Sequence, residues 1–253
     1  MHGGFTLPLA YAPDNLTNSE LGWRSNWLAG RLHWNGTLYQ EDWTHAQVFA
    51  AGPEFGGAGA AANGGTYRVR GIETSVGLQI RGGFTVDAGG AWSHGRLVKE
   101  GTFYWNDGTP INFNTLQYAN GTKVANFGGA LGSPLAGAPP FQANIRARYE
   151  IDFDAVRTTF QVGAAHQAHS LASATNASID AQGKAAVYDL AAFSSFEAAL
   201  GVANDGWSVQ AYGDNLTDTH AQLFANYYNF VKTVTVSRPR TIGLRFSCHF
   251  GAR

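Results

Sequence analysis

The sequence predicts an all-β fold, an antiparallel transmembrane β-barrel of which about nine strands are visible. This prediction depends on three observations: apolar and polar side chains alternate with a period of two, short and long connections alternate along the chain, and charged residues are scarce. Charged residues make up 14% of the 253 positions, well below the roughly 25% usual for soluble proteins. A chain with so few charges cannot cover a large water-facing surface.

The alternation is clearest in two segments. Between residues 141 and 152, six apolar residues starting at Phe141 occupy the odd positions, and the even positions hold Gln142, Asn144, Arg146, Arg148, Glu150 and Asp152. Near the end of the chain, Ile242, Leu244 and Phe246 alternate with small or charged residues. Successive side chains of a strand point to opposite faces, so each segment predicts a strand with one apolar face and one polar face.

Weaker copies of the same pattern complete a count of nine strands. We expect them at residues 19–28, 31–45, 67–80, 84–97, 141–151, 156–168, 191–202, 207–216 and 239–250. Tyr67 and Val69 have the opposite parity to Ile72 and the apolar residues that follow it. This change of parity predicts a β-bulge near Gly71.

The connections between these strands alternate strictly in length. Tight turns are expected at residues 29–30, 81–83, 152–155 and 203–206, and long segments rich in glycine, asparagine and aromatic residues at 46–66, 98–140, 169–190 and 217–238. Short periplasmic turns, long extracellular loops and strands that are apolar outward and polar inward are typical of transmembrane β-barrels. Such barrels have an even number of strands, so a count of nine predicts that further strands are missing.

Several classes of protein are excluded by composition. The formal net charge of -1 argues against a nucleic-acid partner, which would require a basic surface. No apolar run approaches the 18 residues of a transmembrane helix, and no signal peptide is expected at the start. Cys248 is the only cysteine, which excludes an internal disulfide. No catalytic motif is present, so we expect neither an enzyme nor a cofactor.

Several motifs in the chain resemble the TonB-dependent receptors, which are outer-membrane transporters of Gram-negative bacteria. Residues 14–43 resemble the family's mid-barrel hairpin, with the sequence DNLTNSELGWRSNWLAGRLHWNGTLYQEDW. Residues 71–77, GIETSVG, resemble the start of the strand that follows this hairpin in the family. GWSVQAYGDNLTDTHAQLF, residues 206–224, and SRPRTIGLRFSCHF, residues 237–250, resemble the closing hairpin. The resemblance covers nearly the whole chain, in the family's order and spacing.

This resemblance implies that residues 1–253 are the C-terminal part of a 22-stranded receptor barrel in the bacterial cell outer membrane. It implies nutrient uptake, such as that of a ferric siderophore, cobalamin or a glycan. The plug domain and the first barrel strands have no counterpart in this sequence. The implied partners are outer-membrane lipid, the barrel-assembly machinery through the C-terminal strand, and, in the full-length parent, a plug domain and TonB. Residues 251–253 follow Phe250, whereas family members usually end on that aromatic.

Two groups of residues are candidates for function. The candidate lumen wall consists of Glu73, Arg146, Arg148, Glu150, Tyr212 and Arg245. The candidate ligand contacts in the extracellular loops are Tyr104, Trp105, Phe113, Tyr118, Tyr227 and Tyr228. Each group has a structural alternative: the charges can form a hydrated wall that pairs with itself, and loop aromatics can pack on one another.

Tryptophan and histidine residues also have two readings. Trp23, Trp27, Trp34, Trp43, Trp92 and Trp207 lie near expected strand ends, which favours an aromatic girdle at the lipid interfaces over a sugar-stacking platform. His166 and His169 form an H-x-x-H pair. Residues at i and i+3 of a strand point to opposite faces, so we expect no shared metal ion.

Two other hypotheses remain open at this point. One is a secreted β-sandwich carbohydrate-binding module whose tryptophan and tyrosine side chains stack on sugars. The other is a small, complete porin-like barrel of about ten strands that uses part of residues 1–12 as a further strand. A sandwich would need one polar, solvated face per sheet and could have short loops at both ends. Detergent dependence would separate the barrel hypotheses from the sandwich, and conductance would separate a complete pore from a fragment.

Overall fold

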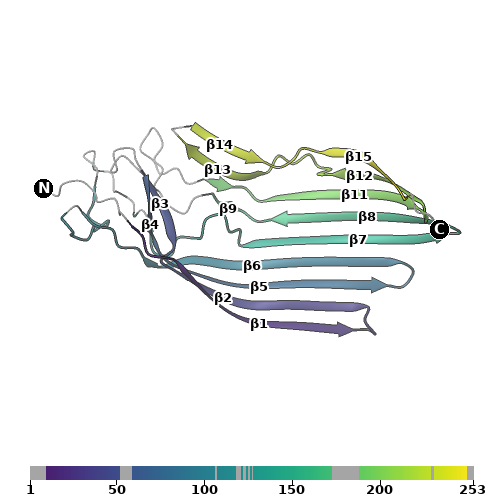
Figure 1. The fold of residues 1–253 in the computed structure, drawn as a ribbon, viewed down its shortest axis with the longest axis horizontal. Helices are drawn as coiled ribbons and strands as arrows, with labels where there is room; N and C mark the ends of the chain where they lie inside the picture. The colour runs from purple at the N-terminus through teal and green to yellow at the C-terminus, as the bar shows by residue number, and fades with distance from the viewer. Residues whose placement is uncertain are drawn as a thin grey trace.

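The computed structural model shows one open antiparallel sheet of nine strands (Figure 1). It describes residues 10–51, 59–105, 107–117, 121, 124, 126, 128–172, 188–228 and 231–249. The order of strands in the sheet is β1-β2-β5-β6-β7-β8-β11-β12-β15. The described residues include no helix that is long and apolar enough to cross a bilayer.

The nine strands confirm the predicted ones to within a few residues at each end. They are β1 (Asn15–Trp27), β2 (Leu32–Thr44), β5 (Gly65–Ile80), β6 (Phe84–Glu100), β7 (Phe141–Phe153), β8 (Val156–Gln167), β11 (Phe193–Ala203), β12 (Trp207–Asp214) and β15 (Thr241–Cys248). Each strand forms an antiparallel ladder with its neighbour, as between Ile145 and Ala164 of β7 and β8. Most strands exceed the roughly ten residues that span a bilayer.

The four tight turns lie at one end of the sheet and the long connections at the other (Figure 1). We call these the turn end and the loop end. The long connections contain three small two-stranded sheets, formed by β3 (Gln47–Ala51) with β4 (Gly59–Asn63), β9 (Ser170–Leu171) with β10 (Asp189–Leu190), and β13 (Gln222–Tyr228) with β14 (Val231–Val236). This segregation is the arrangement predicted for a transmembrane barrel.

The two faces of the sheet differ as the sequence predicts. The outer face bears large apolar side chains that no described residue covers: Leu21, Leu38, Ile72, Trp92, Ile145, Phe160, Leu200, Ile242, Leu244 and Phe246. Ile242, Leu244 and Phe246 are 76%, 78% and 69% exposed. We call this set the apolar belt. The inner face bears most of the polar and charged residues of the same strands, so the sheet places its apolar side toward lipid rather than toward a protein core.

No second sheet packs face to face on the nine strands among the described residues, so the β-sandwich hypothesis is wrong. The nine-stranded sheet does not close on itself, and its edges are β1 and β15. The porin-like hypothesis takes a further strand from part of residues 1–12, of which residues 1–9 lie outside the described part of the chain and residues 10–12 form no strand. The fold is therefore a partial barrel wall.

The predicted bulge near Gly71 is wrong. Gly71 pairs in unbroken register with Tyr39 on one side and Ser93 on the other. The register shifts instead between Thr66 and Tyr67, nearer the loop end. Tyr67 has the opposite parity because it faces inward, where only 2% of it is exposed, rather than because the strand bulges.

Two small hydrophobic cores lie at the loop end. The first consists of Ala46, Tyr67 and Leu97, with Trp43 and Leu135 packed against it. Trp43 therefore faces inward and does not belong to the aromatic girdle, unlike the exposed Trp27, Trp34 and Trp92. The second core, which we call the loop core, consists of Ala62, Phe103, Ile111 and Val124. The described parts of the 46–66 and 98–140 connections thus pack into folded structure.

The β5–β6 turn provides a first testable prediction. Gly82 and Gly83 both have positive φ angles, 82° and 79°, where a side chain costs about 1–2 kcal/mol. A Cβ atom on Gly83 would lie 2.1 Å from the carbonyl oxygen of Glu150, whereas a Cβ on Gly82 would meet nothing within 4 Å. We expect Gly83→Ala to lower the urea midpoint of unfolding in detergent clearly more than its control, Gly82→Ala. Equal effects would contradict the close approach of this turn to β7.

Candidate functional site

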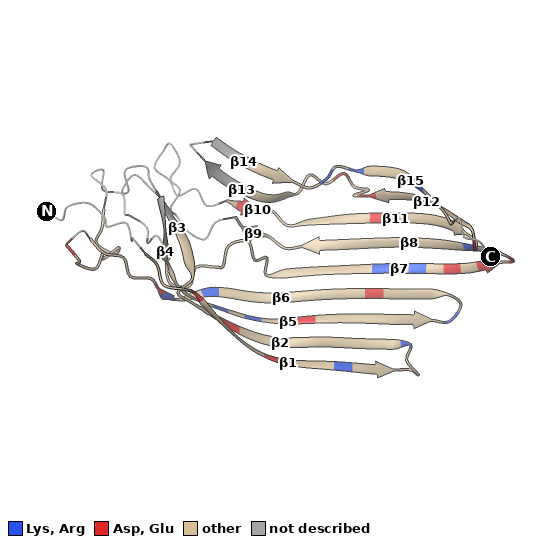
Figure 2. Ribbon diagram, viewed as in Figure 1, with Lys and Arg blue, Asp and Glu red and all other residues tan. Residues whose placement is uncertain are grey.

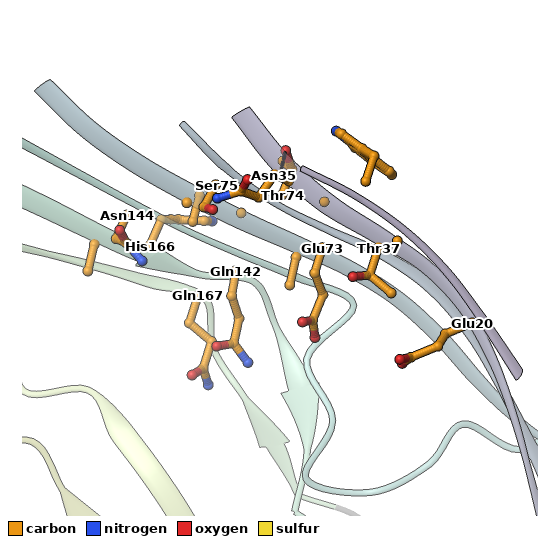
Figure 3. Close-up of a pocket in the computed structure, with 18 of the residues that line it drawn as sticks. Glu20, Asn35, Thr37, Glu73, Thr74, Ser75, Gln142, Asn144, His166 and Gln167 are labelled. Atoms are coloured by element: carbon orange, nitrogen blue, oxygen red, sulfur yellow. Dashed lines mark hydrogen bonds between the residues drawn. The ribbon is translucent and has the colours of Figure 1, made fainter. Parts of the chain in front are cut away.

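The inner face forms an open groove of about 1120 Å³ that extends from β1 across to β11. Glu20, Thr37, Glu73, Gln142 and Gln167 point from five strands toward its concave side (Figure 3). All five belong to the polar parity of their strands, which is why the alternation of the sequence places them together. The groove offers carboxylates, amides and a hydroxyl, a lining that suits water and polar solutes.

Glu73 is the only candidate lumen residue that lines this groove. The other groove residues were not proposed as one site from the sequence, because which strands lie side by side depends on register. Asn35 and Asn144 illustrate this: they also line the groove but come from β2 and β7, which β5 and β6 separate. The two-residue period identified the face of each side chain but not its neighbours across the sheet.

Arg146, Arg148 and Glu150 lie on the inner face of β7, in the middle and toward the turn end. The Nη2 atom of Arg146 lies 3.3 Å from Oε1 of Glu197 on β11, and Arg148 forms an ion pair with Glu150. The Glu197 side chain crosses above Gly163 of β8, since a Cβ at that glycine would lie 2.7 Å from Glu197 Cγ. Because Gly163 has no side chain, Arg146 on β7 and Glu197 on β11 can reach each other across β8.

These ion pairs favour the structural alternative for the wall. Their side chains are one third to more than one half exposed, and exposed ion pairs contribute only about 0–1 kcal/mol. A second cavity of about 680 Å³ lies beside them, between the inner face and the segment that follows β12. Its charged lining residues carry both signs: Asp87, Arg146, Glu197, Asp214 and Arg238. The described wall is polar, open to solvent and nearly balanced in charge.

Tyr212 and Arg245 form a separate contact near the β15 edge. The guanidinium carbon of Arg245 lies 5.3 Å from the centre of the Tyr212 ring, and its Nη1 donates to Oε1 of Gln210 at 3.0 Å. The ring also fills the space above Gly243, where a Cβ would lie 2.6 Å from the tyrosine oxygen. The pair lines a small hollow of about 280 Å³. The structure therefore brings these two predicted residues together, but apart from Glu73.

The candidate loop residues divide into three groups. Trp105 and Phe113 pack against the loop core, and Phe113 meets Phe103 edge to face at 5.9 Å. Tyr104 is 49% exposed. Tyr118 lies outside the described residues, and Tyr227 and Tyr228 lie on β13 with side chains that are not described. Among the described candidates, Tyr104 is thus the one available to a ligand, and packing accounts for Trp105 and Phe113.

The corner after β12 is held by side-chain hydrogen bonds to the backbone. Asn215, which has a positive φ of 49°, donates from Nδ2 to the carbonyl oxygens of Thr219 and Arg238. Asp218 accepts a hydrogen bond of 2.9 Å from the backbone N–H of Arg240. The corner therefore fixes where β15 begins relative to β12.

The carboxyl group of Asp218 makes this corner sensitive to acid. The hydrogen bond from the Arg240 backbone lowers the pKa of Asp218 below its usual range. A carboxylate whose folded pKa is lowered stabilises the fold above its unfolded pKa of about 3.9, and this stabilisation is lost as the pH falls through the folded pKa. We expect Asp218→Asn to be less stable than the wild type near neutral pH. The difference in urea midpoint between the variant and the wild type should shrink as the pH falls toward 3. A difference that grows toward pH 3 would contradict this account.

The two histidines of the H-x-x-H pair have different partners. His166 Nδ1 lies 2.9 Å from the hydroxyl oxygen of Ser194, and His169 Nε2 lies 2.8 Å from Oδ1 of Asp189. Within the described ranges, no three histidine, cysteine or acidic side chains converge in a group that could hold a metal ion. The pair therefore supports packing and hydrogen bonding at the loop end.

Comparisons with solved structures identify the architecture. The ferric yersiniabactin uptake receptor FyuA from Yersinia pestis matches 94% of the chain with a TM-score of 0.63 at 14% identity. The ferric-catecholate import receptor Fiu from E. coli K12 matches 95% with a TM-score of 0.61 at 20% identity, and the copper transporter OprC matches 94% with a TM-score of 0.61 at 17% identity. At these identities the likeness shows the fold.

The chain is shorter than the proteins that it resembles. It spans 30%, 28% and 31% of the lengths of FyuA, Fiu and OprC. No curated protein sequence matches it. The family model for the TonB-dependent receptor-like β-barrel matches residues 5–216, which is most of the 253 residues. With its polar inner face, apolar belt and segregated loops, the chain belongs to the TonB-dependent receptor β-barrel family, whose members are proteins of the Gram-negative outer membrane.

Proposed function

We propose that this chain forms nine strands of the wall and the extracellular loops of a receptor that takes up a scarce nutrient across the outer membrane. The observation that supports this most directly is the pairing of a lipid-facing apolar belt with a hydrated inner groove in one open sheet. A wall of this kind separates lipid from an aqueous passage. A role in such a wall agrees with the family, whose members are transport receptors rather than enzymes.

The rest of the receptor is proposed on the same basis. Residues 1–253 would be the C-terminal part of a 22-stranded barrel, and the plug domain and the first strands would come from sequence outside this chain. The plug would lie against the inner face, where Arg146, Glu197 and Asp87 offer charges of both signs. Coupling to TonB would act on the plug, so the nine strands alone would not transport actively.

The nutrient is proposed as a metal chelate such as a ferric siderophore, with cobalamin or a glycan as further candidates. FyuA is a ferric yersiniabactin uptake receptor, Fiu a ferric-catecholate import receptor and OprC a copper transporter, which supports a metal-containing cargo without specifying it. The loop end would provide the first contact, and Tyr104 is the predicted loop contact whose side chain the structure describes as exposed.

The test is uptake in the native host. A strain lacking this coding sequence and the same strain complemented with it would be compared for uptake of radiolabelled ferric siderophores, copper, cobalamin and oligosaccharides. Loss of uptake of one cargo, restored by complementation, supports the proposal and identifies the nutrient. Unchanged uptake of every cargo in a strain that normally produces the protein would contradict it. Complementation with Tyr104→Ala then tests the loop contact, with Trp105→Phe as a packing-preserving control.

A further inference from the structure

We propose that the outer face binds the phosphate of a membrane glycolipid at a basic patch formed by Arg68, Arg70 and Arg96. The patch lies at the loop ends of β5 and β6, where Figure 2 shows positively charged positions. It is on the opposite face of the sheet from the groove. The proposed phosphate site does not depend on which nutrient the receptor takes up.

Strand register places the patch directly beyond the apolar belt. Leu38, Ile72 and Trp92 are neighbours across β2, β5 and β6, and all three are exposed on the outer face. Two residues further toward the loops, the same face carries Gln40, Arg70 and His94, and then Asp42, Arg68 and Arg96. At about 3.4 Å per residue the three arginines lie roughly 7–14 Å beyond the belt, which is the depth of lipid headgroups.

The distribution of arginine across the sheet singles out this position. The nine strands contain eight arginines. Five of them have the inner parity: Arg24, Arg146, Arg148, Arg157 and Arg245. The three with the outer parity are the three of the patch, gathered on two adjacent strands at one depth. On the rest of the outer face, as far as the structure describes it, no strand presents an arginine to lipid.

The patch has an uncompensated positive charge. Arg68 lies directly opposite Arg96 in the β5–β6 ladder, and like charges in such cross-strand pairs destabilise a sheet. Asp42 accepts a 2.6 Å hydrogen bond from Nε of Arg68. Arg96 has no hydrogen bond or ion pair from its side chain to any described residue. Three guanidinium groups against one carboxylate leave a net charge of +2, which an external anion would balance.

Hydrogen bonds within the protein leave the terminal N–H groups of Arg68 and Arg70 available to an anion. Gln40 donates to Asp42 at 3.0 Å and accepts from Nε of Arg70 at 2.8 Å. Arg68 and Arg70 therefore use Nε within the protein, and their terminal nitrogens make no hydrogen bond to a described side chain. Two adjacent guanidinium groups with free terminal N–H groups match the bidentate recognition of phosphate. Basic residues next to an apolar membrane surface are a general device for binding phosphorylated lipids.

The test measures lipid binding to the purified chain in detergent, by native mass spectrometry with diphosphorylated lipid A as the probe. The variant carries Arg68→Gln, Arg70→Gln and Arg96→Gln, and the matched control carries Arg24→Gln, Arg146→Gln and Arg245→Gln on the inner face. At about 1 kcal/mol for each cation near a membrane surface, we expect the patch variant to bind roughly 100-fold more weakly. The control should bind as the wild type does.

Further measurements make each outcome decisive. Arg96→Gln alone removes a side chain with no partner in the described structure, so it should fold normally and bind roughly fivefold more weakly. Dephosphorylated lipid A should bind the wild type no more tightly than it binds the patch variant. Inorganic phosphate that binds as tightly as lipid A would overturn the assignment to a lipid. Equal lipid A binding by the wild type, the patch variant and the single variant would overturn the patch itself.

Discussion

Replacing Ile145 with arginine is expected to lower the free energy of unfolding in lipid vesicles by about 2–4 kcal/mol, the usual cost of such a charge at the bilayer midplane. Ile145 lies in the middle of β7, opposite Ala88 and Ala164, and is 50% exposed on the outer face. In water an exposed position would accept arginine readily, so the predicted loss requires hydrocarbon around the side chain. Urea titrations of the chain inserted in vesicles would measure it.

The matched control is the preceding residue. Asn144 lies on the inner face and lines the groove, next to Gly89 and Ala165. Asn144→Arg adds the same charge to the same strand but places it toward water, so its effect should stay within about 0.5 kcal/mol. If the two variants lose equal stability in vesicles, or if neither loses any, the assignment of the two faces is refuted.

The second large effect is expected in the loop core. Phe103 is 9% exposed and packs with Ala62, Ile111 and Val124. Truncating a buried phenylalanine costs about 3–5 kcal/mol. All four residues belong to the long connections or to β4, so Phe103→Ala should open the loop without unfolding the nine-stranded sheet. We expect proteolysis of the loop on intact cells to accelerate roughly 100-fold or more, since 1.4 kcal/mol corresponds to a factor of ten.

Tyr104→Ala is the control for this experiment because the adjacent side chain is 49% exposed. Its proteolysis rate should stay close to that of the wild type. The sheet of the Phe103→Ala variant should retain the wild-type urea midpoint in vesicles. A loss of sheet stability in this variant, or rapid cleavage of both variants, would show that the loop core is not a separate folded unit.

The strands were largely predictable from the sequence because lipid and water impose a period of two on each of them. The face of Ile145 and that of Arg146 follow from this alternation alone, and so do the tight turns between strands. The same rule suggested a bulge at Gly71 because it assumes one solvent for each face along the whole strand. Trp43 was assigned to the girdle from its position near a strand end, and it faces inward. Near the loop end the inner face is covered by packed connections, so Tyr67 and Trp43 are apolar there for a different reason.

The candidate site was predictable only in part, since its contacts depend on register between strands far apart in sequence. Arg146 reaches Glu197 across Gly163, and Arg68 meets Arg96 across a ladder that contains a bulge. The alternation of apolar and polar residues within each strand predicts neither pairing. The sequence also does not distinguish ligand contact from packing for the loop aromatics. Trp105 and Phe113 were consistent with both roles, and only the packing of the 98–140 connection distinguishes them.

The two edges of the sheet determine what can complete it. Because every neighbouring pair is antiparallel, β1 and β15 run in the same direction, both from the loop end to the turn end. Pairing β1 with β15 would therefore create a parallel seam, whether within one molecule or between two copies inserted in the same orientation. A fully antiparallel ring requires a complementary sheet with an odd number of strands whose two edge strands run from the turn end to the loop end. A second copy of the nine-stranded sheet inserted in the same orientation does not supply one, because both of its edge strands run the other way.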